Sequence, residues 1–315
     1  MERVQLADTN LMVHPLHLGG NPFGWGADRD QSFAVLDAYA EAGGNFIDTA
    51  DAYSVWVDGN SGGESETIIG EWMASRGNRD DMVIATKVGM HPKHKGLDPA
   101  NIRKCIDSSL RRLGTDHVDV YYAHVDDESV DQVAVAETFD ALVRSGKVSY
   151  LGASNFTLDR LQSAMKISAK YSLACYRVVQ DRYNLVARSA VDSQKQAYLR
   201  SNGIAELPFH SLASGFLTGK HTGGDATGSV RGERVADFLE NQEALRALEI
   251  LDDVASAHNA TMTATTLAWQ LSHDFIPSTI ASARVPEQLS ELLAGTELQL
   301  AEDEITALNE AWVEA

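Results

Sequence analysis

The chain has 315 residues, 44% of them hydrophobic, which is enough to bury a large core and excludes a disordered chain. Its formal net charge of −19 argues against nucleic-acid binding, which requires a cationic surface. No run approaches the roughly 18 apolar residues of a membrane span, and residues 1–15 contain no apolar signal segment. Two isolated cysteines, Cys105 and Cys175, predict neither a disulfide framework nor a zinc site, so a cytoplasmic protein is expected.

In chain order, the first predicted element is a β-hairpin over residues 3–13 that turns at Asp8-Thr9-Asn10 and plugs the bottom of the fold. Short apolar runs bounded by turn or polar residues then predict eight strands, at 16–20, 45–49, 82–87, 118–124, 148–155, 177–181, 203–209 and 278–282. Helical periodicity lies between them, at 30–42, 64–75, 99–113, 131–145, 157–170 and 188–202. Pro99 suits a first helical turn, and Gly43, Gly114 and Gly146 suit helix ends.

This alternation predicts an α/β fold in which one domain, residues 1–315, forms a (β/α)8 TIM barrel. An open doubly wound sheet is the alternative, but GGNPFGWG after the first strand does not match the GxGxxG turn that would favour it. The step between the seventh and eighth strands is about twice the others and forms a long insertion with two helical patterns. Its glycine-rich segment, 221–234, is either a flap over a ligand or a surface loop.

Four polar residues of different chemistry follow consecutive strands. Asp48, Lys87 and His124 end the second, third and fourth strands, and Tyr53 lies just beyond the second. Each alone has an ordinary explanation: a turn cap, loop packing, a solvated strand end or a core histidine. In a parallel barrel, however, all strand ends meet at the face where catalysis occurs, so we predict that the four residues converge there.

An acid, a phenol, an amine and an imidazole together suit proton delivery to a carbonyl oxygen. A free tyrosine has a pKa near ~10, which is high for a general acid. We expect the Lys87 ammonium to lower the pKa of Tyr53 and Asp48 to pair with Lys87. His124 would hydrogen-bond the substrate oxygen and orient it.

These residues lie in motifs that resemble the aldo-keto reductase family. DTADAY, ATK and YYAH match its catalytic segments, and four further segments match in order: LGASNF (151–156), QDRYN (180–184), SLASGFLTGK (211–220) and ASARVPEQL (281–289). The similarity covers residues 3–312. The resemblance implies an NADPH-dependent enzyme that reversibly reduces aldehydes or ketones, with Tyr53 as the general acid. The implied partner is a small carbonyl or alcohol substrate.

The resemblance also assigns binding residues. Ser154, Asn155 and Gln180 would hold the nicotinamide carboxamide, and Phe209 would stack on the nicotinamide ring, where the family usually has tyrosine. The remaining NADPH contacts would come from Gly20, Asp48, Leu212, Ser214, Gly215, Lys220, Ser282, Arg284 and Gln288, with Arg284 on the 2′-phosphate. Independently of the resemblance, Phe23, Trp25 and Trp56 lie in the loops after the first and second strands, so they either form an apolar substrate wall beside His124 or only pack these loops together. No metal is expected, because the histidines of HPKHK (91–95) lack a third ligand.

Two departures from the family pattern affect the rim of this site. Ser54 follows the tyrosine where the family often has glycine, and it opens a longer loop. His210-Ser211-Leu212 replaces a segment that usually contains proline.

Two other functions remain open. One is a barrel aldolase that uses Lys87 as a Schiff base. The other is non-catalytic, since barrels of this family also serve as NADP(H)-sensing subunits of potassium channels.

Overall fold

Eight short parallel strands form the centre of the molecule in the computed structural model, which describes residues 2–220 and 232–312. They are adjacent in the order β10-β3-β4-β5-β6-β7-β8-β9. The N–H of Ile280 in β10 donates to the carbonyl of Pro208, just after β9, at 3.3 Å. This hydrogen bond joins the two edges of the curled sheet. The predicted (β/α)8 barrel is therefore confirmed. Its strands are β3 (Leu16–Gly19), β4 (Phe46–Asp48), β5 (Val83–Val88), β6 (Val118–Ala123), β7 (Val148–Ser154), β8 (Tyr176–Gln180), β9 (Ala205–Glu206) and β10 (Thr279–Ala281).

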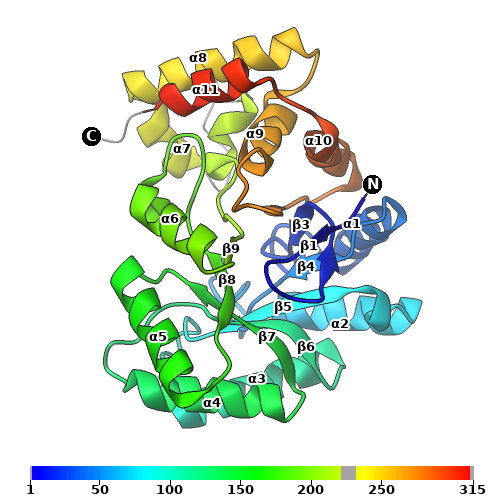
Figure 1. Cartoon of the computed structure of the whole chain (residues 1–315). Helices are drawn as coiled ribbons and strands as arrows, with labels where there is room; N and C mark the ends of the chain where they lie inside the picture. The colour runs from blue at the N-terminus through cyan, green and yellow to red at the C-terminus, as the bar shows by residue number, and fades with distance from the viewer. Residues whose placement is uncertain (1, 221–231, 313–315) are drawn as a thin grey trace.

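Helices surround the strands (Figure 1), and those predicted between residues 30 and 170 begin and end within one residue of the predicted bounds. Asp98 accepts a hydrogen bond from the Ala100 N–H, Pro99 occupies the first turn of α3, and Gly114 ends that helix at φ 64°. The helices that connect successive strands are α1 (Arg29–Glu41), α2 (Glu64–Arg76), α3 (Pro99–Leu113), α4 (Gln132–Arg144), α5 (Leu158–Tyr171), α6 (Ser193–Ser201) and α9 (Met262–Leu271). After β10 come α10 (Pro286–Glu297) and α11 (Glu302–Glu310).

Two elements differ from their predicted lengths. β9 covers only Ala205–Glu206, although the Leu207 and Phe209 N–H groups still donate to the Val179 and Asp181 carbonyls beside β8. The predicted helix at 188–202 is divided into η2 (Ser189–Val191) and α6, because Asp192 leaves the helical conformation and caps α6 through the Lys195 N–H at 2.8 Å. A further short turn, η1 (Arg79–Asp81), precedes β5.

The barrel interior is filled by one face of each strand. Phe46, Ala85, Val120 and Val178 belong to this apolar cluster. Tyr122 fills the middle opposite Gly152, where an added Cβ would lie 2.3 Å from the Tyr122 ring. The interior is therefore packed with side chains below the strand ends, and a ligand has room only above them.

The hairpin predicted at the amino terminus is present and closes the other end of the barrel. β1 (Val4–Gln5) and β2 (Met12–Val13) pair antiparallel, and Leu6 and Val13 pack into the interior cluster. Polar contacts hold the hairpin to the starts of strands: Asp8 pairs with Arg177 at 3.1 Å, and Asn45 Nδ2 donates to the Met12 carbonyl at 2.9 Å. The predicted plug at the bottom is confirmed.

The predicted insertion between the seventh and eighth strands carries η3 (Ala213–Thr218), α7 (Gly232–Leu239) and α8 (Gln242–Ala257) in addition to α9. α8 lies beside α11 at one edge of the molecule (Figure 1). Residues 221–231 of the glycine-rich segment, predicted as a flap or a surface loop, lie outside the described residues. Among the described helices, none has the length and apolar character needed to cross a bilayer.

Candidate active site

Strand periodicity places the polar residues above the interior core. Because alternate residues of a strand face the same side, Asp48 lies above Phe46, and Lys87 lies above Ala85. Gln180 likewise follows Val178 on β8. The carboxyl ends of three strands therefore direct polar side chains to one place.

A closed set of hydrogen bonds joins the predicted catalytic residues. Lys87 Nζ lies 2.6 Å from Asp48 Oδ2, 2.8 Å from the Thr49 carbonyl and 2.9 Å from Tyr53 Oη. Tyr53 Oη donates to Asp48 Oδ2 at 3.0 Å, and Gln180 Nε2 donates to Asp48 Oδ1 at 3.0 Å. The Lys87 and Asp48 side chains are 0% and 2% exposed, so this ion pair is almost completely removed from water.

The ionisation of this group corrects one expectation. Burial and the Asp48 carboxylate raise the pKa of Tyr53 well above its ordinary value, where the sequence predicted that Lys87 would lower it. The reason is that Asp48 and Lys87 lie equally close to the phenol, so the carboxylate offsets the ammonium. Burial lowers the pKa of Lys87; burial alone would raise that of Asp48, but Lys87 brings it below its ordinary value.

His124 completes the set without joining the hydrogen-bonded group. Its ring centroid lies 6.2 Å from that of Tyr53, in an edge-on arrangement. Its Nδ1 is buried and has no partner among the described residues. Burial and Lys87 lower the pKa of His124 to about 3, so the imidazole is neutral at physiological pH. A neutral imidazole can hydrogen-bond a substrate oxygen, but it is not an acid that competes with Tyr53.

The loop after β4 positions Tyr53 by an unusual backbone conformation. Ser54 adopts φ 70°, the left-handed region in which a glycine is most easily accommodated. Its buried hydroxyl donates to the Phe23 carbonyl at 2.8 Å, which ties this loop to the loop after β3. Ser54 therefore holds a backbone conformation that favours glycine, and its hydroxyl supplies a hydrogen bond that glycine could not make.

Two of the three aromatic residues predicted for the substrate wall lie in contact with each other. Trp25 and Trp56 meet edge-on at 5.8 Å, and the Trp56 ring lies 6.4 Å from that of Tyr53. Trp56 is 50% exposed. Phe23, in contrast, is 0% exposed and belongs to the hydrophobic core, so its side chain does not line an open surface.

The residues assigned to the nicotinamide end lie together at the ends of β7, β8 and β9. Asn155 Nδ2 donates to the His124 carbonyl at 2.9 Å and to Ser154 Oγ at 3.0 Å, while Ser154 Oγ donates to the Gln180 carbonyl at 2.6 Å. Asn155 is exposed, and Phe209 is half-buried. Gln180 is 2% exposed and its amide is used on Asp48, so it supports the catalytic group in this structure.

The remaining predicted cofactor residues lie in two groups. Leu212, Ser214 and Gly215 are in or next to η3, where Ser214 and Gly215 have φ values of 60° and 106°, and Lys220 Nζ follows at 3.6 Å from Glu291. Ser282, Arg284 and Gln288 surround the start of α10, which has no side-chain cap.

In that second group, the Gln288 amide oxygen accepts the Arg284 N–H at 2.8 Å. The Arg284 side chain is exposed and forms no ion pair within residues 2–220 and 232–312. Gly20 lies beside the site for a packing reason, because a Cβ there would lie 2.8 Å from Ser65 Oγ and 2.9 Å from the Asp48 carbonyl.

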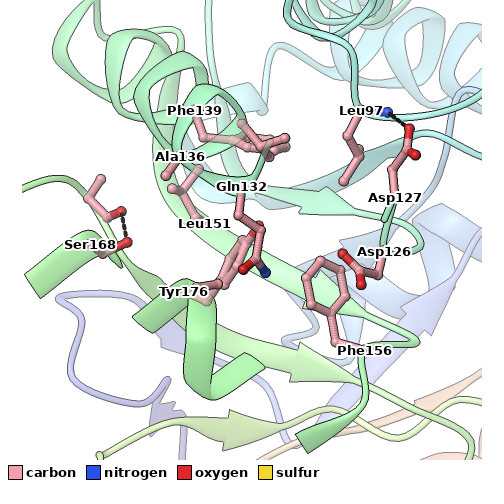
Figure 2. A pocket seen from close by; sticks show the side chains of 13 residues that line it. Leu97, Asp126, Asp127, Gln132, Ala136, Phe139, Leu151, Phe156, Ser168 and Tyr176 are labelled. Atoms are coloured by element: carbon pink, nitrogen blue, oxygen red, sulfur yellow. Dashed lines mark hydrogen bonds between the residues drawn. The ribbon is translucent and has the colours of Figure 1, made fainter. Parts of the chain in front are cut away.

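Two other features are separate from this group. A pocket on the flank of the barrel between α4 and α5, lined by Leu151, Phe156 and Tyr176 among others, contains none of the predicted catalytic residues (Figure 2). In the HPKHK segment, His91 Nε2 donates to the Ser61 carbonyl at 2.8 Å and its ring stacks on His94. Within the described parts of the chain, no group of three or more His, Cys, Asp or Glu could hold a metal.

Sequence reasoning missed three contributors. The Thr49 carbonyl accepts from Lys87, His17 is a fully buried imidazole whose pKa is lowered to about 3 by burial, and Asp181 holds the Asn155 backbone. Two of these residues could have been found from their position in the sequence, because Thr49 directly follows Asp48 and Asp181 directly follows Gln180 at a strand end.

Similarity to known proteins extends over nearly the whole chain. Residues 15–313 match the sequence profile of the Aldo/keto reductase family. An uncharacterized oxidoreductase from Bacillus subtilis is 32% identical over 98% of this chain and 95% of its own length. An aryl-alcohol dehydrogenase from Pestalotiopsis microspora is 29% identical, covering 98% of this chain and 82% of its own. A putative voltage-gated potassium channel subunit beta from Schizosaccharomyces pombe is 29% identical, covering 93% and 87%.

Proposed function

Because this chain belongs to the aldo/keto reductase family, we propose that it is an NADPH-dependent enzyme that reversibly reduces aldehydes or ketones to alcohols. The observation that carries the proposal is the contact of Tyr53 Oη with both Lys87 Nζ at 2.9 Å and Asp48 Oδ2 at 3.0 Å. When bound, NADPH supplies the hydride to the carbonyl carbon. The protein supplies the geometry and the proton.

Tyr53 is the proton donor in this proposal. Because the pKa of Tyr53 lies well above its ordinary value, the phenol is protonated throughout the neutral range. As the proton moves to the carbonyl oxygen, the Lys87 ammonium stabilises the negative charge that develops on Tyr53 Oη. Neutral His124 hydrogen-bonds the same substrate oxygen and fixes its position above the phenol.

The described residues fit NADPH at both ends. At one end, the Asn155 side-chain amide donates to His124 and Ser154, so its oxygen remains available to accept from a carboxamide. At the other end, exposed Arg284 stands before the start of α10, where N–H groups and the helix dipole favour phosphate. The protein's charge of −19 would otherwise disfavour an anionic cofactor, so this local cation supports the assignment.

The substrate in this proposal carries an aromatic or long apolar group. Trp56 lies edge-on beside Tyr53 and is itself met edge-on by Trp25, and Trp56 is 50% exposed, which leaves it accessible to such a group. The name of one relative, aryl-alcohol dehydrogenase, points in the same direction. Phe23 has no part in this wall.

The Schiff-base alternative is not favoured by the position of Lys87. An amine that attacks a carbonyl must be neutral and reachable, whereas Lys87 Nζ is buried and donates to three oxygens.

The test is Tyr53→Phe, which keeps the ring and removes the hydroxyl. Single-turnover hydride transfer from NADPH to an aromatic aldehyde should slow by at least the ~10²–10⁴ that general acid catalysis contributes. NADPH affinity should be retained, because most of the proposed cofactor contacts lie on other strands and Asp48, on β4, is left unchanged. Hydride transfer at a near-normal rate in this variant would remove Tyr53 from the role of proton donor.

The same measurements separate the enzyme from a cofactor-sensing subunit. A sensor would bind NADPH but would not oxidise it with any member of a panel of aldehydes and ketones. Turnover by the wild type that Tyr53→Phe abolishes would assign the activity to this site.

A further inference from the structure

Three ionisable side chains are buried together beside the active site. Asp181 directly follows β8, Lys195 lies in the first turns of α6 and Glu206 ends β9; they are 3%, 3% and 0% exposed. Burying charged groups is unfavourable unless they are paired and hydrogen-bonded, so such a cluster calls for a specific set of contacts. None of the three residues has a role in the proton transfer described above.

Asp181 and Lys195 hold the loop after β7 at two successive residues. Lys195 Nζ lies 2.6 Å from Asp181 Oδ2 and 2.8 Å from the Phe156 carbonyl. The other oxygen, Asp181 Oδ1, accepts the Asn155 N–H at 3.0 Å. Asn155 adopts φ 59°, a left-handed conformation that asparagine tolerates better than most residues other than glycine. The ion pair therefore fixes the backbone on both sides of the Asn155 carbonyl.

The backbone of Asp181 extends the same support to β9. Its N–H donates to Glu206 Oε1 at 2.8 Å, and its carbonyl accepts the Phe209 N–H at 2.9 Å. The carbonyl of the preceding residue, Gln180, accepts the Ser154 hydroxyl. The four residues assigned to the nicotinamide end therefore all depend on Gln180 and Asp181. Gln180 is one of the four, and Ser154 donates to its carbonyl. The other two, Asn155 and Phe209, donate to Asp181.

A proton on Glu206 makes this arrangement electrically balanced. Burial and the Asp181 carboxylate raise the pKa of Glu206 well above its ordinary value, and its Oε2 has no partner among the described residues. The cluster then contains one cation, Lys195, and one anion, Asp181.

We infer that Asp181 and Lys195 are positioning residues for the nicotinamide end of the cofactor. They act through Asn155 and Phe156 and do not touch the cofactor themselves. This inference rests on the proposed function, which supplies NADPH as the ligand. It adds a requirement: loss of the ion pair should loosen the nicotinamide end and leave the adenosine-phosphate end, at α10, unchanged.

The test is Lys195→Met, which keeps an unbranched side chain and removes the ammonium group. Fluorescence titrations compare NADPH with 2′-phospho-ADP-ribose, which has the adenosine and phosphate groups but no nicotinamide. We expect the Kd of NADPH to rise about tenfold or more, the effect of losing a charged hydrogen bond, and that of 2′-phospho-ADP-ribose to change less than about twofold. A variant that is only generally destabilised would not separate the two ligands.

Arg200→Gln is the matched control, because Arg200 lies on the same helix, its ion pair is with exposed Asp274 at 2.7 Å, and no contact between Arg200 and Asn155 or Phe156 is seen among the described residues. It should alter neither affinity. Equal weakening of both ligands by Lys195→Met, or an unchanged NADPH affinity, would overturn the inference. If Lys195→Met does not fold, Lys195→Gln is judged by the same two affinities. A wild type that binds neither ligand would instead overturn the proposed function.

Discussion

Tyr53 shows how a single phenol depends on the balance of its neighbours. The sequence places Lys87 and Asp48 on adjacent strands and so predicts that both approach Tyr53, but only the distances show that they approach equally, at 2.9 and 3.0 Å. The two charges therefore oppose each other, and burial raises the pKa of Tyr53. Tyr53 is therefore protonated at neutral pH but is a weak acid, so proton transfer depends on Lys87 stabilising the phenolate that forms.

Arg284 is the residue on which cofactor choice should depend. In the described parts of the chain its side chain is exposed and forms no ion pair, and it extends past Gly26, where an added Cβ would lie 3.4 Å from Arg284 Cδ. A charged hydrogen bond to a 2′-phosphate contributes ~1.5–3 kcal/mol, so Arg284→Ala should weaken NADPH binding roughly 10- to 150-fold. NADH, which lacks this phosphate, should bind as before.

Fluorescence titration of both cofactors checks this prediction. Arg246→Ala, which removes an exposed arginine on α8, controls for the loss of one positive charge from the protein. Equal losses of NADPH and NADH affinity in Arg284→Ala would show that the guanidinium does not contact the 2′-phosphate.

At the scale of elements, the loop after β4 joins catalysis to substrate choice. It carries Tyr53 and, three residues later, Trp56, whose ring leans edge-on against Trp25. Removing the Trp56 ring should lose on the order of 1–2 kcal/mol of apolar contact with an aromatic substrate. We therefore predict that Trp56→Ala lowers kcat/KM for an aromatic aldehyde roughly 5- to 30-fold relative to a short aliphatic aldehyde.

Steady-state kinetics with the two aldehydes provide this ratio. Tyr171→Ala removes another exposed aromatic ring, 46% exposed at the end of α5, and should leave the ratio unchanged. The wall does not exist if Trp56→Ala slows both substrates by the same factor.

The elements themselves were predictable because local patterns and barrel geometry agree. Short apolar runs, capping residues such as Asp98 and glycines such as Gly114 specify each βα unit locally, and strand ends must then converge. The site residues carried on strands, Asp48 and Lys87, follow directly from this convergence. The buried position of Phe23 does not follow from this convergence, because packing between two loops decides whether an aromatic side chain in a loop faces the core or the solvent.

The buried cluster of Asp181, Lys195 and Glu206 behind Asn155 also could not be predicted from the sequence. Its members come from a strand end, a helix and another strand, and each looks like an ordinary polar residue by itself. Only the spatial arrangement shows that Asp181, Lys195 and Glu206 share one site. Long-range pairs of this kind have no periodic pattern in the sequence.

At the scale of the whole molecule, the interior contains ionisable groups that respond to pH in opposite directions. Burial lowers the pKa of His17 to about 3 and of His14 to about 4, so both histidines favour unfolding as pH falls below the ordinary value of 6.5. Asp51 has the opposite pH dependence, because its folded state is more stable when the carboxyl group is protonated. Burial and nearby Glu66 raise its pKa to about 7, although Arg112 and Lys87 partly oppose this.

Asp51 therefore limits stability on the alkaline side. It is 3% exposed, and neither of its oxygens has an N–H or O–H donor among the described residues. Because its folded pKa is raised from 3.8 to about 7, the stability that protonation provides is complete below about pH 4 and is lost as pH rises through 7. A tenfold change in acid dissociation between the folded and unfolded chain corresponds to about 1.4 kcal/mol, so ionised Asp51 should weaken the fold by a few kcal/mol at pH 8.

Asp51→Asn, which cannot ionise, should therefore be more stable than the wild type at pH 8, with a smaller gain at pH 5. Denaturant unfolding of both proteins at the two pH values measures the difference, and the histidines cancel because both proteins contain them. Asp127→Asn is a control of opposite sign, since hydrogen bonds from Ser129 and the Leu97 N–H hold the pKa of Asp127 below its ordinary value. That substitution should lose stability at pH 8. An equal change at both pH values in Asp51→Asn would mean that packing, and not ionisation, decides the contribution of Asp51.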